Sequence, residues 1–233
     1  MKNAWNGLLS LLLVLTALNL QPVYAQAQPP APGNFCRFGI GVPKGLEGYD
    51  LSLLGVGSYL DWSAWRNYKV PSNIQFLNVV KISDREYPTT LINMPYLLSQ
   101  WPGGIWILGN EPDSEVIFQD HITAETFAER YYVLADIIRK TDPAAMIGFG
   151  PIIQPTPIRM YYLDLALARL NSLAQAGGYA NASELIDIFT IHNFLLNESP
   201  CTGTMTRAIS LSQLIGVREC RAAIRPGCGR HLL

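Results

Sequence analysis

Three consecutive residues near the middle of the chain place an amide, a carboxyl group and a proline side by side. Asn110, Glu111 and Pro112 directly follow the apolar run 104–109. Such a run predicts a buried strand, and Pro112 prevents the strand from continuing. A glutamate at the C-terminal end of a buried strand is well placed to act as a general acid or base, although it could also be a solvated turn carboxylate. The Asn110 amide beside it could bind a substrate hydroxyl or cap the turn.

Polar side chains also occur at the ends of other expected strands. His192 lies near the end of the sixth strand, Lys81 near the end of the third, and Gln154 shortly after the fifth. The carboxyl ends of parallel strands meet along one edge of a sheet, so these groups are expected around one site. A lone histidine is often structural, and it is the shared position of these groups that favours a site.

Aromatic side chains gather near the same strand ends. Trp62 ends the second expected strand with Asp61 beside it, and Trp106 lies within the fourth. Flat apolar faces beside polar groups are a common way to hold sugar rings. Asp61 could then bind a hydroxyl group, while Trp106 could serve the core as well as the site. The neighbouring aromatic residues are Tyr59, Trp65 and Trp101.

The elements that must position these residues alternate between two periods. Apolar runs of strand length are separated by longer segments with helical period. Several runs are almost continuously apolar, which is typical of parallel strands covered on both faces. The expected strands are residues 35–42, 56–62, 76–82, 104–110, 145–151 and 187–193.

Three helices are expected between the later strands. The first lies between Pro88 and Gln100; the second follows an N-cap at Thr123 and ends at Asp142. The third follows Thr156, with proline at its first position, and ends at Gly177. The expected buried stripes are Phe127, Tyr131, Leu134 and Ile138 in the second helix and Leu163, Leu167 and Leu170 in the third.

This alternation, with a short loop expected after each strand, predicts a parallel α/β fold. Both a closed (β/α) barrel and an open doubly wound sheet fit the pattern. The sequence contains no glycine-rich loop of the GxGxxG or GxxxxGKS type, which weakens a nucleotide-binding interpretation.

The N-terminal residues are typical of an export signal. Residues 1–25 combine Lys2, a leucine-rich stretch at 8–20 and small residues at Val23 and Ala25, although an uncleaved anchor is the alternative. Residues 26–33, rich in proline, alanine and glutamine, are expected to form a disordered leader. The mature protein is therefore expected to be secreted or periplasmic and to lack a membrane span.

Charge and cysteine content narrow the classes of partner. Charged residues make up 15% of the chain and the formal net charge is −1, which becomes −2 when Lys2 leaves with the signal. This balance does not suggest nucleic acid or an anionic membrane as a partner. The cysteines show no CxxC pair and no Cys/His metal spacing, so neither a metal nor a cofactor is expected. They are Cys36, Cys201, Cys220 and Cys228.

Two motifs together resemble clan A of the retaining glycoside hydrolases. They are Trp-Ile-Leu-Gly-Asn-Glu-Pro at 106–112 and Asp-Ile-Phe-Thr-Ile-His-Asn-Phe at 187–194, and the similarity covers about residues 35–194. The resemblance implies a (β/α)8 barrel of the TIM type that acts on oligo- or polysaccharides. It further implies that Glu111 is the acid/base, that Asn110 contacts the sugar 2-hydroxyl and that His192 is a subsite residue.

The chain departs from that family after its sixth strand. The family's nucleophile is a glutamate that ends the seventh strand, but only 39 residues follow Phe194, too few for two more strands with their helices. Neither Glu198 nor Glu219 follows an apolar run. The barrel-like domain is therefore expected to cover residues 34–200 and to be incomplete, with about six βα units.

Residues 201–233 are expected to form an atypical tail, with four arginines among the last 17 residues. The tail could come from a frameshift or truncation, or it could belong to a genuine short variant in which Cys201 pairs with Cys220 or Cys228. The expected function is glycoside hydrolysis by a retaining mechanism. The alternatives are a non-catalytic carbohydrate-binding protein and an inactive fragment.

Overall fold

The computed structural model describes residues 38–42, 55–65, 74–192, 196–198 and 205–206. The chain divides into two units, Met1–Asn34 and Phe35–Leu233, and every described residue belongs to the second. The expected export signal, leader and cysteines lie outside the described residues, as does almost all of the tail.

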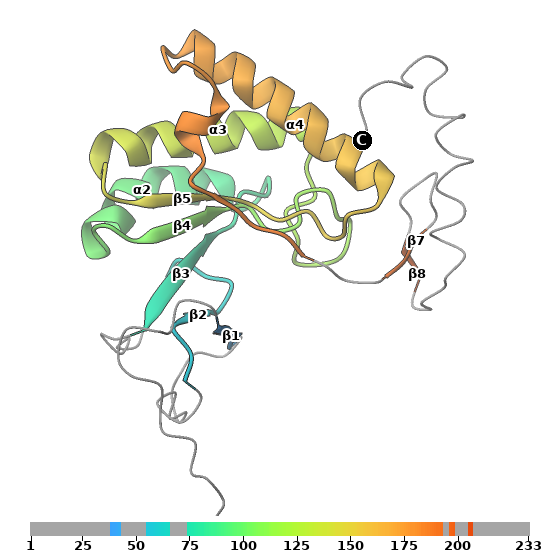
Figure 1. Ribbon diagram of the computed structural model, residues 1–233, viewed down its shortest axis with the longest axis horizontal. Helices are drawn as coiled ribbons and strands as arrows, with labels where there is room; N and C mark the ends of the chain where they lie inside the picture. The colour runs from blue at the N-terminus through green and yellow to red at the C-terminus, as the bar shows by residue number, and fades with distance from the viewer. Residues whose placement is uncertain (1–37, 43–54, 66–73, 193–195, 199–204, 207–233) are drawn as a thin grey trace, which may run out of the picture. The chain divides into compact units, whose positions relative to one another are not determined.

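Six parallel strands form the main sheet, in the order in which they occur along the chain. Each strand pairs in parallel with the next one. Figure 1 shows β3, β4 and β5 running side by side. The strands are β1 (Gly39–Gly41), β2 (Ser58–Leu60), β3 (Gln75–Val80), β4 (Ile105–Leu108), β5 (Met146–Phe149) and β6 (Ile188–Phe189).

Three long helices connect the later strands of the sheet. Helix α2 (Tyr87–Gln100) follows β3, α3 (Ala124–Thr141) follows β4, and α4 (Pro157–Ala176) follows β5. A short 3-10 helix, η2 (Ala182–Leu185), leads into β6. The three helices predicted from sequence are thereby confirmed, including the N-cap of α3 at Thr123 and the C-cap of α4 at Gly177.

The described helices pack against one face of the sheet. Alternate strand residues stand in register across β3, β4 and β5, so that Val80, Leu108 and Phe149 form one layer. These residues share one core cluster with buried residues of all three helices, and in Figure 1 the helices lie on the same side of the strands. A doubly wound sheet has helices on both faces and a reversal in strand order. The molecule instead has an α/β half-barrel sheet interleaved with helices.

Helix α3 forms the centre of the core. Phe127, Tyr131, Leu134 and Ile138 are all fully buried, as their helical spacing predicts. The ring of Phe127 lies 4.9 Å from that of Phe149 on β5 and 6.4 Å from that of Tyr162 on α4. These contacts fix α3 against both the sheet and α4.

Helix α4 differs from its predicted stripe. Leu170 is fully buried, but Leu163 and Leu167 are only partly buried, and the other apolar residues fully buried on this helix are Ala166 and Ala174. The small alanines occupy the face that packs against the neighbouring elements, because they leave room for a close helix approach. The larger leucines lie at its edges.

The strands are shorter than predicted, and this decides where the site residues lie. Strand β4 ends at Leu108, so Asn110, which was expected to be the last residue of that strand, lies in the following loop with Glu111. Strands β7 (Asn197–Glu198) and β8 (Met205–Thr206) form an antiparallel pair. The two strands lie on either side of residue 200, where the barrel-like region was expected to end. Among the described helices, none is both long enough and apolar enough to span a membrane.

Candidate active site

A cleft of about 1360 Å³ lies at the carboxyl ends of β2, β3, β4 and β6. Its lining brings together six of the eight residues singled out from the sequence, although they are far apart along the chain. A concave site with a few converging polar groups and an apolar lining is typical of a ligand site. The six residues are Asp61, Trp62, Lys81, Asn110, Glu111 and His192.

Glu111 and His192 are in direct contact within this cleft. The Nδ1 atom of His192 lies 2.6 Å from Oε1 of Glu111. The Glu111 side chain is 6% exposed and that of His192 is 25% exposed. A nearly buried carboxyl group in contact with an imidazole can exchange a proton with a bound ligand while its orientation stays fixed.

The backbone holds Glu111 in an unusual conformation. Its φ is +47°, in the left-handed region that residues other than glycine rarely adopt. The N–H of Glu111 donates to the carbonyl oxygen of Pro151 at 2.9 Å, and its own carbonyl accepts from the N–H of Ser114 at 3.1 Å. The first bond ties the turn after β4 to the loop after β5, and the second closes the turn itself. Such strain, of about 1 kcal/mol or more, is often found at functional sites.

Asn110 is held through both its backbone and its side chain. Its N–H donates to Oδ2 of Asp120 at 2.6 Å, and its carbonyl accepts from the N–H of Asp120 at 3.2 Å. The Nδ2 group of Asn110 donates to Oε1 of Gln119. Burial raises the pKa of the Asp120 carboxyl, and the N–H groups of Asn110 and Ile82 partly offset that rise.

Asp113 lies on the same turn as Glu111 but in different surroundings. Its side chain is 1% exposed and pairs with Arg159 on α4 at 3.4 Å. The carbonyl of Asp113 also accepts from Nη1 of Arg159, and Oδ1 accepts from the N–H of Ile153 at 3.1 Å. Burial raises the pKa of the Asp113 carboxyl to about 6, against the opposing effect of Arg159.

The rim of the cleft carries exposed aromatic side chains. Trp62 is 40% exposed, Trp65 is 50% exposed and Phe118 is 77% exposed. Trp65 stacks on Tyr96 of α2 with ring centroids 6.4 Å apart. The backbone φ angles of Trp62 and Phe118 are +59° and +72°, so both aromatic residues, like Glu111, are held in the left-handed region. Rigid, exposed aromatic faces can stack on the apolar faces of sugar rings.

The prediction that Trp106 binds a substrate is wrong. Its side chain faces the helices, is fully buried in the core cluster and is not part of the cleft lining. The reason is the alternation of side chains along β4: Trp106 and Leu108 point to the helix-covered face. Tyr59 is also fully buried, and Trp101 precedes β4 and packs partly buried against the core.

Gln154 acts behind the cleft wall. Only 2% of it is exposed, and it does not line the cleft. Its Oε1 atom accepts from the N–H of Leu196, which does line the cleft. In place of the predicted substrate contact, Gln154 holds the backbone of Leu196 at the cleft wall.

Sequence reasoning found Asn110 and Glu111 in the connection 109–123 but missed what the rest of this connection contributes to the site. This segment connects β4 to α3 and supplies Gln119, Asp120 and Phe118. The signal that could have found it is its length, because connections of this length within a compact domain usually carry function. Lys81 supports the segment, since its Nζ donates to the carbonyl of Phe118.

Within the part of the chain that the structure describes, no three His, Cys, Asp or Glu side chains form a group that could hold a metal ion. A scan against protein-family models finds no match for this sequence, and a search of curated proteins finds none either.

Proposed function

We propose that this chain carries the acid/base side of a retaining glycoside hydrolase site in a (β/α) barrel of the TIM type, related to clan A. The observation that carries the proposal is the Glu111–His192 contact of 2.6 Å inside the cleft, next to the Asn110 amide. The sequential parallel strands, with helices on one face, support the barrel assignment. The substrate would be an oligo- or polysaccharide held by the aromatic rim, and an export signal fits such a substrate.

In the proposed first step, the Glu111 carboxyl gives its proton to the glycosidic oxygen as the bond between that oxygen and the anomeric carbon breaks. A second carboxylate attacks the anomeric carbon and forms a covalent ester. In the second step, Glu111 takes a proton from water while the water oxygen bonds the anomeric carbon and releases the second carboxylate. Asn110 would bind the neighbouring hydroxyl, and His192 would orient Glu111. This chemistry needs no cofactor.

One observation favours a carbohydrate-binding protein without catalysis as the second candidate. Besides Glu111, the described acidic residues of the cleft are Asp61 and Glu86. Asp61 accepts from the N–H of Ser63 at 3.1 Å, and Glu86 accepts from the hydroxyl of Ser83 and pairs with Arg85. Both carboxylates are therefore engaged in local contacts, and neither has the strand-end position of the resembled family's nucleophile.

The substitution Glu111→Gln separates the two candidates. Measured on the full chain with a panel of aryl glycosides, the hydrolase predicts that kcat/KM falls by about 100-fold or more, because loss of general acid–base catalysis has effects of that size. The matched control is Glu115→Gln, an exposed glutamate of the same loop, which is expected to keep wild-type turnover.

Saccharide binding, followed by tryptophan fluorescence, completes the test. If the wild-type protein shows no turnover, and both it and the Glu111→Gln variant bind saccharide, the result supports the binding protein. Absence of both binding and turnover would contradict both candidates.

A further inference from the structure

Two consecutive residues outside the predicted site, Gln119 and Asp120, hold Asn110 from different directions. Asp120 makes two hydrogen bonds to the backbone of Asn110. Its carboxylate accepts from the Asn110 N–H at 2.6 Å, and its own N–H donates to the Asn110 carbonyl at 3.2 Å. Gln119 accepts a hydrogen bond from the Nδ2 group of Asn110. The backbone and the amide group of Asn110 are thus fixed by neighbouring residues of one loop.

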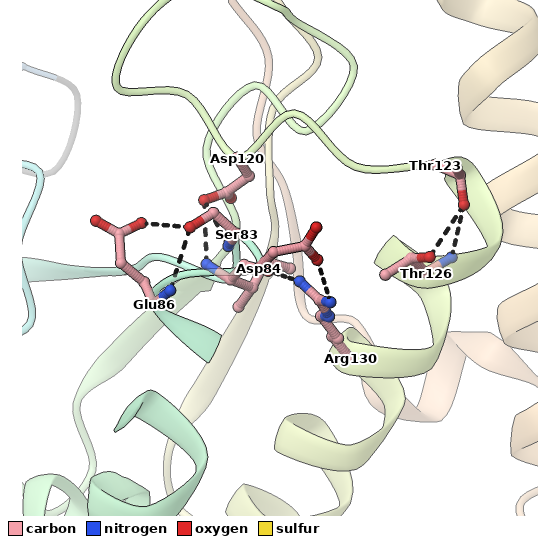
Figure 2. Close-up of polar contacts among 8 residues, drawn as sticks. Ser83, Asp84, Glu86, Asp120, Thr123, Thr126 and Arg130 are labelled. Carbon is pink, nitrogen blue, oxygen red and sulfur yellow. Dashed lines mark hydrogen bonds and ion pairs between the residues drawn. The ribbon is translucent and has the colours of Figure 1, made fainter. Parts of the chain in front are cut away.

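The second oxygen of Asp120 extends this support to the adjacent strand. Oδ1 accepts from the N–H groups of Ile82 and Ser83 at 3.1 and 3.2 Å, just after β3 ends. Figure 2 shows the Asp120 carboxylate directed at Ser83 in this turn. Because Asp120 is 2% exposed, water does not compete for these bonds. One carboxylate therefore fixes the turn after β3 relative to the turn after β4.

This arrangement has a consequence for the amide of Asn110. One of its two N–H bonds is directed at Gln119, which fixes the rotation of the amide group and therefore which of its atoms face the cleft. Glu111, the next residue, inherits its backbone position from Asn110. A hydroxyl contact that strengthens in the transition state depends on such a fixed orientation.

We propose that Gln119 and Asp120 are positioning residues, which orient Asn110 toward the sugar hydroxyl beside the bond that Glu111 cleaves. This inference rests on the proposed function. If it is correct, removing the acceptor at position 119 lowers kcat more than it raises KM, because the misplaced amide costs mainly transition-state binding.

The variants Gln119→Met and Gln119→Glu test the role of Gln119. Methionine keeps the side-chain length but removes the acceptor, so kcat for an aryl glycoside should fall about tenfold with KM within about twofold. Glutamate keeps an acceptor and should restore most of kcat. The control is Gln100→Met, which removes a glutamine at the end of α2 whose Nε2 bonds the neighbouring Ser99, and which should leave kcat unchanged.

The side-chain amide signal of Asn110 in NMR spectra provides a readout that does not require turnover. It is assigned by its loss in Asn110→Ala and should shift in Gln119→Met but not in Gln100→Met. An unchanged signal in Gln119→Met overturns the inference whether or not the protein cleaves glycosides. The signal could shift in Gln119→Met while the wild-type protein shows neither turnover nor saccharide binding. That result would support the positioning contact and contradict the proposed function.

Asp120→Asn and Asp187→Asn separate positioning from general stability. Asp187 Oδ2 likewise accepts a backbone N–H, that of Ile147 at 2.7 Å, but at the amino ends of the strands. Both variants should lower the thermal midpoint, since each loses a buried or half-buried acceptor. Only Asp120→Asn should also reduce kcat at a temperature where both variants are folded. Equal kcat values for the two variants would contradict a positioning role for Asp120.

Discussion

Two carboxyl groups on one turn illustrate how surroundings separate roles at the scale of the residue. Glu111 reaches into the cleft and contacts His192. Asp113, two residues after Glu111 in the chain, is buried against Arg159. Asp113 has no access to the cleft and joins the turn to α4. It therefore supports the backbone that holds Glu111 in its left-handed conformation.

The buried Asp113 carboxyl predicts a pH dependence of stability. Its pKa is about 6 in the folded chain against 3.8 for an exposed aspartate, so between pH 4 and 6 the folded state binds more protons than the unfolded state. The Asp113 carboxyl alone should therefore lower the free energy of unfolding by about 3 kcal/mol as the pH rises through this window. Urea unfolding at pH 4 and pH 7 measures it.

The variant Asp113→Asn should lose this contribution to the pH dependence, because the side-chain amide of asparagine does not titrate in this range. Asp164→Asn, at an exposed position on α4, is the control and should follow the wild-type curve. A wild-type stability that rises from pH 4 to pH 6, with no difference in Asp113→Asn, would contradict the assignment.

The sequence predicts the positions of candidate site residues well where the direction of the strands alone decides those positions. Glu111, Asn110 and His192 follow apolar runs, and the parallel sheet brings them to one edge. The prediction fails for Trp106, because a continuously apolar run does not reveal which face of the strand its side chains occupy. Gln119 and Asp120 were missed because a loop without periodicity gives no local signal of what it contacts.

At the scale of the element, helix α3 shows how local chemistry places the loop before it. The Oγ1 atom of Thr123 accepts from the N–H of Thr126 at 3.2 Å, which caps the helix where residues 109–123 end (Figure 2). Glu125 in the first turn and Lys140 in the last complement the helix dipole. These signals are short-range, and for that reason the ends of α3 could be predicted.

The capping bond predicts a measurable effect of Thr123→Ala. Loss of an N-cap side chain costs about 1 kcal/mol, so the urea midpoint should fall accordingly. The control is Thr141→Ala, which makes the same change at an exposed position of the last turn of α3 and should cost much less. Equal losses in the two variants would show that the cap does not contribute.

Strand ends and the buried face of α4 could not be predicted as closely. Hydrogen-bond pairing, which ends β4 at Leu108, depends on the neighbouring strand rather than on the hydrophobicity of the run. The buried face of α4 is set by the close approach of other elements, which favours Ala166 and Ala174 over the larger Leu163 and Leu167. Both are tertiary effects that local patterns do not encode.

At the scale of the whole molecule, the sequential strand order shows that one rule, a strand followed by a helix on the same face, is repeated through β3, β4 and β5. This repetition could be predicted from sequence, because the alternation of strand-length apolar runs with helical segments is visible there. The choice between an open and a closed sheet could not be predicted from sequence, since it depends on the side to which each helix crosses.

Strand β6, the last strand of the main sheet, predicts self-association of the chain. Phe189, whose register partner Phe149 faces the helices, is 56% exposed, and Ile191, two residues beyond the end of β6, is 77% exposed. Within the described residues β6 pairs with β5 alone, and an unpaired strand edge is a common site of pairing with another chain. We expect sedimentation velocity to show concentration-dependent association, because exposed apolar edges are sites of intermolecular pairing.

The substitution Ile191→Lys should weaken this association, since a charge two residues beyond an edge strand disfavours pairing with a second strand there. Ile92→Lys is the matched control, because Ile92 is equally exposed, at 78%, but lies on α2 away from the edge. The edge accounts for association only if Ile191→Lys reduces it and Ile92→Lys does not. A wild-type protein that stays monomeric at all concentrations would instead mean that the edge is protected, and the exposed Phe189 and Ile191 would then have to be covered within the same chain.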